Sequence, residues 1–244
     1  MRAATTTAAA PATTNVAALA VAQPTAPDPR VGAIFLDGVP TPTCSGSVLH
    51  SAAGDLILTA AHCLTEGADS TFVPGYAGAP QPDNTWNIDA VYLDPRWLDT
   101  RDPLADYAIA RVTRDTDGSI ESRVGSGLML SPPPAATGIV AVTGYRMGAA
   151  DAPIRCQAST APVAGGYLSL PCAGLVAGTS GAPWITGTSM VSGLTGGLDG
   201  GGCQDDVSYS PPFDERITRL LTRAEQGGPT DAAPTATDGC PDPH

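Results

Sequence analysis

Glycine and proline interrupt this chain so often that few segments are long enough for a helix. The 244 residues include 28 Gly and 24 Pro, and both residue types favour turns over regular structure. Between them lie short apolar runs such as 31–36 and 86–93. Short strands separated by turns are typical of β-sandwiches and β-barrels. The sequence therefore predicts an all-β fold, and its length fits one such unit.

The expected strands follow the apolar runs along the chain. They cover 31–36, 44–49, 55–59, 86–93, 107–112, 138–145, 154–159, 167–170, 182–186, 190–195 and 207–210. One helix is expected near the carboxyl end, because apolar residues recur at helical spacing from Phe213 to Leu221 and Gly227 then ends the pattern.

Acidic residues outnumber basic residues by 24 to 12, which gives a formal net charge of -12. A surface with this charge repels nucleic acid and anionic lipid, so we expect neither as a partner. No apolar run is long enough to span a membrane.

The amino-terminal segment differs in composition from the rest of the chain. It begins Met1-Arg2 and ends in the small residues Ala20-Val21-Ala22, a pattern typical of a signal peptide and its cleavage site. A disordered low-complexity arm is the alternative. We therefore expect 1–30 to lie outside the fold, 31–226 to form the folded domain, and 227–244 to form a tail rich in Pro and Thr.

Six cysteines indicate an oxidising compartment, so we expect the protein to be extracellular. No two of them have the close spacing of a structural zinc site, and neither a metal nor another cofactor is implied. Sequence order alone leaves their pairing open. They are Cys44, Cys63, Cys156, Cys172, Cys203 and Cys240.

Two short motifs contain the groups needed for acyl transfer. An apolar strand ends in Leu58-Thr59-Ala60-Ala61-His62-Cys63, where His62 is a candidate base. A second motif, Gly178-Thr179-Ser180-Gly181-Ala182-Pro183, places Ser180 between glycines that allow a tight turn and expose its hydroxyl. The backbone N–H groups of Gly178 and Ser180 can point at one oxygen and form an oxyanion hole.

The base also needs a carboxylate to orient it. We expect Asp106, which starts a strand and lies between His62 and Ser180 in the chain. Asp99 and Asp102 are the alternatives, and we interpret both as solvated loop residues.

These motifs resemble those of the trypsin-like (chymotrypsin-fold) serine peptidases. The order His, Asp, Ser along the chain is also that of this fold. The Gly-Thr-Ser-Gly version is similar to secreted bacterial members, including the glutamyl endopeptidase-like group. Over about 31–225, the resemblance implies two six-stranded antiparallel β-barrels, near 31–120 and 121–226, with a C-terminal α-helix.

The resemblance also implies a disulfide between Cys44 and Cys63 across the histidine loop. Closing a loop of this size stabilises a fold by about 3 kcal/mol in the chain-entropy model. For the other cysteines, Cys156 with Cys172 and Cys203 with Cys240 form the simplest scheme. A pairing of Cys172 with Cys203 remains an alternative.

By resemblance, the base of a specificity pocket lies near Gly174 and its wall near Thr195, Gly196 and Gly197. No Asp stands at the base, so we expect no preference for Arg or Lys. Gly196 and Gly197 replace part of a Ser-aromatic-Gly sequence, on which the family's usual support for the catalytic Asp and its usual contacts with the substrate strand depend. Thr179 replaces the Asp that binds a new amino terminus in animal trypsins, so we expect no activation switch of that kind.

The sequence thus predicts a secreted serine endopeptidase that works through a Ser180, His62 and Asp106 triad and an acyl-enzyme. We expect a monomer that acts on protein or peptide substrates. Two alternatives stay open: an inactive binding protein built on the same scaffold, and a hydrolase of esters or peptidoglycan-linked substrates.

Overall fold

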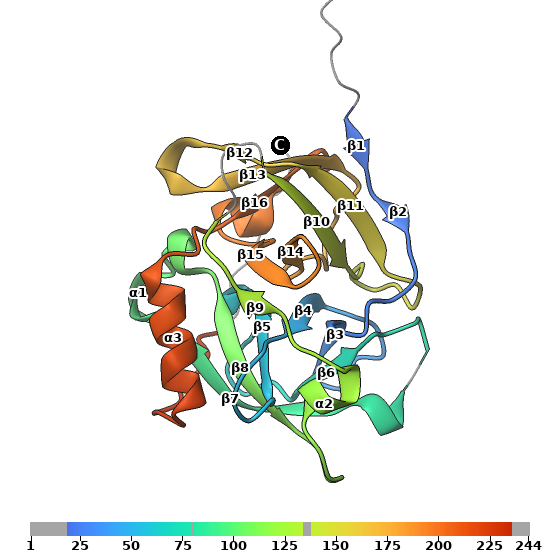
Figure 1. The fold of residues 1–244 in the computed structure, drawn as a ribbon, viewed down its shortest axis with the longest axis vertical. Coiled ribbons are helices and arrows are strands. Elements are labelled where there is room, and N and C mark those ends of the chain that lie inside the picture. The colour runs from blue at the N-terminus through green and yellow to red at the C-terminus, as the bar shows by residue number, and fades with distance from the viewer. Residues whose placement is uncertain (1–18, 80, 134–137, 236–244) are drawn as a thin grey trace, which may run out of the picture.

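The computed structural model describes residues 19–79, 81–133 and 138–235. Within these ranges strands predominate and short helices lie at the periphery (Figure 1), so the all-β prediction is confirmed. The strands form two halves, and the buried apolar side chains form a separate cluster in each.

The first half is a closed six-stranded barrel, as predicted. Its strands are β3 (Val31–Leu36), β4 (Cys44–Val48), β5 (Leu56–Thr59), β6 (Ser70–Pro74), β7 (Trp86–Leu93) and β8 (Ala108–Thr113). They pair in the order β3-β4-β5-β8-β7-β6 and close on themselves. Ile34, Phe72 and Trp86 are almost completely buried in the core of this half.

The second half, where the resemblance implies the second six-stranded antiparallel barrel, is built from two sheets. Its strands are β1 (Ala20–Val21), β2 (Gln23–Pro24), β9 (Met129–Leu130), β10 (Ile139–Gly144), β11 (Ile154–Ser159), β12 (Ala161–Pro162), β13 (Leu168–Ala173), β14 (Pro183–Thr186), β15 (Met190–Leu194) and β16 (Val207–Ser210). They form a six-stranded sheet, β2-β11-β10-β14-β15-β9, and a four-stranded sheet in which β13 pairs with β1, β12 and β16. Side-chain packing around the buried Trp184, rather than a continuous ring of hydrogen bonds, joins the two sheets.

Two of the expected disulfides are confirmed. Cys44 is bonded to Cys63, and Cys156 is bonded to Cys172. The second bridge links β11 of one sheet to β13 of the other. Cys240 lies outside the described residues, so its pairing with Cys203 stays a prediction.

Residues 20–24, which we expected to lie outside the fold, form β1 and β2. The strand β1 pairs with β13, and β2 pairs with β11. Small residues such as those of Ala20-Val21-Ala22 suit a cleavage site, but they also allow a strand to pack closely against a sheet edge. The described part of the tail is likewise attached, because the Asp231 N–H donates to the Val91 carbonyl at 2.8 Å.

The predicted C-terminal helix is α3 (Glu215–Glu225), and it packs against β7 and β8. Asp214 caps its first turn by accepting a hydrogen bond from the Arg216 N–H at 2.8 Å. Ile217, Leu220 and Ala224 form its buried face. Two shorter helices, α1 (Pro95–Thr100) and α2 (Ile120–Val124), were not predicted. None of the described helices is long and apolar enough to cross a membrane.

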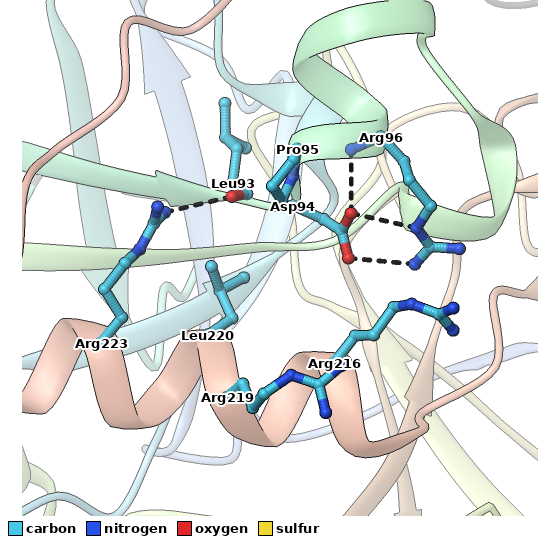
Figure 2. Close-up of a pocket in the computed structure, with 8 residues that line it drawn as sticks. All are labelled: Leu93, Asp94, Pro95, Arg96, Arg216, Arg219, Leu220 and Arg223. Atoms are coloured by element: carbon cyan, nitrogen blue, oxygen red, sulfur yellow. Dashed lines mark hydrogen bonds and ion pairs between the residues drawn. The ribbon is translucent and has the colours of Figure 1, made fainter.

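Four arginines line a groove of about 360 Å³ beside α1 and α3 (Figure 2). Each has a carboxylate partner: Arg96 with Asp94, Arg216 with Asp214, Arg219 with Glu215, and Arg223 with Asp231. Figure 2 also shows Arg223 donating to the Leu93 carbonyl, at 3.1 Å. Because each arginine is paired with a carboxylate, the groove carries little excess positive charge. We interpret the contact of Arg223 with the Leu93 carbonyl as attaching α3 to the barrel.

The link between the two sheets of the second half gives a test of stability. Replacing Cys156 and Cys172 by Ala should lower the free energy of unfolding by about 3 kcal/mol, because the bridge closes a loop with a sequence separation of 16. Urea unfolding of both proteins measures this difference. An unchanged free energy of unfolding would contradict a stabilising role for this bridge.

Candidate active site

Strand pairing in the barrel brings His62 and Asp106 together. In the β5–β8 pair Thr59 lies opposite Ala108, so the residues that follow β5 and those that precede β8 emerge at one edge. His62 lies in a single 3₁₀ turn, Ala61–Cys63, directly after β5. Asp106 follows a similar turn, Pro103–Ala105, directly before β8.

The Asp106 carboxylate is buried, with 1% of the residue exposed. It accepts hydrogen bonds from the His62 N–H at 3.0 Å and from the His62 Nδ1 at 2.7 Å. The Gly197 N–H donates to the same carboxylate at 2.7 Å. Because a carboxylate only accepts, the imidazole proton sits on Nδ1, and Nε2 of neutral His62 is free to accept a proton.

The two alternative carboxylates lie elsewhere. Asp99 is an exposed residue of α1. Asp102 caps the turn before Asp106 by accepting from the Leu104 N–H at 3.0 Å. Of the three candidates, the structure brings Asp106 to His62.

Burial and mutual pairing shift the pKa values of His62 and Asp106 in opposite directions. Burial disfavours the imidazolium, but the charge and hydrogen bond of Asp106 outweigh it and raise the pKa of His62 above 6.5. Burial also disfavours the carboxylate, yet His62 and the Gly197 N–H hold the pKa of Asp106 below its usual value. The arrangement therefore favours an ionised carboxylate beside an imidazole that readily takes a proton.

Strand β4 of the first half holds the loop that carries Ser180. The Ser45 N–H donates to the Ser180 carbonyl at 2.8 Å, and the Ser45 hydroxyl donates to the Gly178 carbonyl at 2.8 Å. The Met147 N–H holds the Ala177 carbonyl at 2.8 Å. Hydrogen bonds from Ser45 and Met147 thus hold three carbonyls of the loop that contains the N–H groups of Gly178 and Ser180.

Those two N–H groups have no intramolecular acceptor among the residues that the structure describes. They are the donors that we expected for an oxyanion hole. Gly178 has φ +93°, and a Cβ added there would lie 2.1 Å from the Met147 nitrogen. Only glycine fits this backbone, as the sequence motif indicated.

His62 and Ser180 line the same groove, which has a volume of about 500 Å³. The Ser180 hydroxyl faces the Gly200 carbonyl at 3.5 Å and makes no hydrogen bond to His62. Gly200 belongs to a 3₁₀ segment, Leu198–Gly201, that forms one wall of this groove.

Of the four residues expected at the specificity pocket, one lines the groove and three do not. Thr195 lines the groove, with its hydroxyl accepting from the Trp184 Nε1 at 3.2 Å. Gly174 donates to the Asp205 carbonyl at 2.7 Å, and Gly196 donates to the Tyr209 carbonyl at 3.0 Å. Neither of these glycines, nor Gly197, is part of the groove lining.

Sequence reasoning missed two parts of the groove. Asp199 and Asp205 belong to its lining, and sequence analysis named neither as a groove residue. The Gly197 contact with Asp106 was also unexpected, and its one sequence signal was the replacement of the family's Ser-aromatic-Gly sequence by Gly196-Gly197.

The described residues contain one cluster of possible metal ligands, formed by Cys44, His62 and Cys63, whose ligand atoms lie within 4.8 Å of one another. The two sulfurs are bonded to each other. A disulfide offers no thiolate, so this cluster supports no metal site.

The contact between His62 and Asp106 gives a direct test of the site. Asp106→Asn should lower the pKa of His62 to below 6.5, because burial remains while the opposing negative charge is gone. Imidazole resonances followed by NMR across pH measure the shift. His50, which is paired with Glu121, is the internal control and should not change. A pKa of His62 that stays above 6.5 would contradict the geometry.

Comparisons with known proteins bear on the fold. No family model matches the chain, and no curated protein matches its sequence. Among solved structures, the thermostable serine protease AL20 from an extremophilic microorganism aligns with a TM-score of 0.71 at 20% identity, over 82% of this chain and 98% of its own. The protease Anisep from Arthrobacter nicotinovorans aligns with a TM-score of 0.72 at 23% identity, over 84% of this chain and 100% of its own.

A Glu endopeptidase gives a TM-score of 0.67 at 16% identity, over 85% of this chain and 97% of its own. At such identities the likeness establishes the fold, and it agrees with the barrel and the C-terminal helix described above. The chain therefore has the chymotrypsin fold of the trypsin-like serine proteases.

Proposed function

We propose that this chain is a serine endopeptidase in which Ser180 is the nucleophile, His62 the base and Asp106 the orienting carboxylate. The observation that carries the proposal is the convergence of three groups on one groove. These are the paired imidazole of His62, the hydroxyl of Ser180, and the unpaired N–H groups of Gly178 and Ser180. A binding module has no need for this combination.

The mechanism follows from these positions. The Ser180 Oγ attacks the carbonyl carbon of the scissile bond, and His62 Nε2 takes the hydroxyl proton. The N–H groups of Gly178 and Ser180 stabilise the oxyanion. The bond to nitrogen then breaks as His62 returns the proton to the leaving amine, which leaves an acyl-enzyme. Water, deprotonated by His62, attacks this ester and releases the acid together with the free serine.

The resting position of Ser180 requires a small movement before this step. Its hydroxyl faces the Gly200 carbonyl at 3.5 Å, a weak contact by hydrogen-bond criteria. Rotation about the side-chain torsion redirects the oxygen toward His62, and staggered rotamers of serine differ little in energy. The groove wall near Gly200 is therefore part of the proposed catalytic cycle.

We also propose that the enzyme is secreted and acts on protein or peptide substrates. The support is chemical: disulfides such as Cys44–Cys63 and Cys156–Cys172 persist in oxidising compartments. The net charge of -12 disfavours nucleic acid and anionic membrane surfaces as partners.

Removal of the nucleophile tests the proposal. Ser180→Ala should lower kcat by about a millionfold, judging from another serine protease, without changing the urea midpoint. A fluorophosphonate should label the unaltered chain at Ser180 and leave the variant unlabelled. Peptide and ester substrate panels measure turnover. Comparable hydrolysis by the variant would place the nucleophile elsewhere, and an unlabelled, inactive parent chain would favour a binding protein.

The Gly197 N–H, as the second donor to the Asp106 carboxylate, gives a separate test. Gly197 has φ +82°, and an added Cβ would lie 3.0 Å from the Pro103 carbonyl oxygen. Gly197→Ala should therefore pull the N–H away from Asp106 and lower kcat by about tenfold or more, because a buried bond to a charged group is lost.

Gly187→Ala is the matched control for this change. Gly187 also has a positive φ, +63°, but no atom lies within 4 Å of an added Cβ. It therefore tests the cost of an alanine at positive φ away from the groove. Equal kcat values for the two variants would mean that the Gly197 contact does not position Asp106.

A further inference from the structure

The segment 20–25 contacts the strand that leads into the Ser180 loop. In the parallel β1–β13 pair, Ala20 lies opposite Cys172 and Val21 opposite Ala173 (Figure 1). The Ala22 N–H then donates to the Ala173 carbonyl at 2.8 Å. Residue 173 is the last of β13, and the chain continues directly into the 174–180 loop.

The same segment reaches the loop itself and the neighbouring sheet. A Cβ added to Gly174 would lie 3.6 Å from the Ala22 Cβ, so Ala22 lies beside the first residue of the loop. Beyond β1, strand β2 pairs with β11, and the Thr25 N–H donates to the Pro153 carbonyl at 2.9 Å. Segment 20–25 thus spans both sheets of the second half at the position where the Cys156–Cys172 disulfide also joins them.

The side chains of residues 20–22 pack as the hydrogen bonds of segment 20–25 require. Ala20 and Ala22 pack against the buried cluster of the second half, while Val21 points outward and is 55% exposed. Alternation of this kind is typical of a strand with one face on the core. Small side chains at 20 and 22 allow the backbone to approach β13.

The loop also has a support within itself, in addition to its contacts with Ser45 and Met147. The Thr179 hydroxyl donates to the Val176 carbonyl at 2.8 Å, and the Thr179 N–H donates to the same oxygen at 3.1 Å. Thr179 carries no charge that could bind an amino terminus. Val31 is completely buried in the barrel, where it pairs with Ser47 and its N–H donates to the Asp28 carbonyl. A newly cut end at Val31 therefore has no route to the loop.

We propose that residues 20–25 are a brace that holds the 174–180 loop in its substrate-ready form. The brace acts as a preceding part of the same chain and needs no newly formed amino terminus. It fixes the end of β13, and through it the residues Leu175 to Ser180 that line the groove. The functional consequence rests on the proposed peptidase activity, whereas the structural coupling does not.

Loss of one hydrogen bond in the full chain tests the brace. Ala22→Pro removes the N–H that binds Ala173, and the hydrogen-bonded amides of the 174–180 loop, those of Gly174 and Thr179, should then exchange with solvent about tenfold faster. The ratio kcat/KM should fall by a similar factor. Ala26→Pro is the matched control, because Ala26 is exposed and its N–H donates no hydrogen bond among the described residues.

A second variant covers the case in which the proline disrupts folding. Ala20→Asp places a carboxylate against the apolar cluster and should detach β1 with the same faster exchange at 174–180. Unchanged exchange at 174–180 in both variants would overturn the brace. If the unaltered chain neither hydrolyses peptides nor takes a fluorophosphonate label, the proposed function fails, and the exchange measurement still decides whether the brace exists.

Discussion

The buried carboxylate of Asp106 is the interaction on which the arrangement of the candidate site depends. A carboxylate removed from water needs hydrogen-bond donors to stay ionised, and this one receives them from both halves of the molecule. His62 belongs to the first barrel, and Gly197 follows β15 of the second half. The same contacts that satisfy the charge therefore fix the imidazole and set the position of one half against the other.

Strand β4 has a comparable role for the Ser180 loop. All five of its residues are buried, although two of them are serines. Ser45 binds the carbonyls of Gly178 and Ser180, and its hydroxyl also accepts from the Tyr145 N–H at 2.8 Å. A barrel strand of the first half thus orients the N–H groups that belong to the second half. This contact explains why a polar residue, Ser45, lies in a fully buried strand.

The strands that sequence analysis identified are those with continuous apolar or β-branched runs, such as β3 and β7. It missed β6, Ser70–Pro74, because that strand begins with polar residues and ends in proline. It also missed β1 and β2, because alanine and proline carry a weak strand signal and the Ala20-Val21-Ala22 pattern suggested a cleavage site. The second barrel was expected by resemblance, and tertiary structure shows how it is built: its strands pair as two sheets joined by packing and a disulfide.

Local chemistry was readable from the chain alone. Three features depend on residues that are neighbours in sequence: the motif around His62, the glycines on either side of Ser180, and the amphipathic pattern of α3. In each, the conformational preferences of a few residues determine the local structure. Tertiary structure alone decided that Gly197 supplies a donor to Asp106 and that the Ser180 hydroxyl faces Gly200. Those contacts join residues far apart in the chain, so their geometry is set by how the barrel and the two sheets pack, which short-range sequence preferences do not encode.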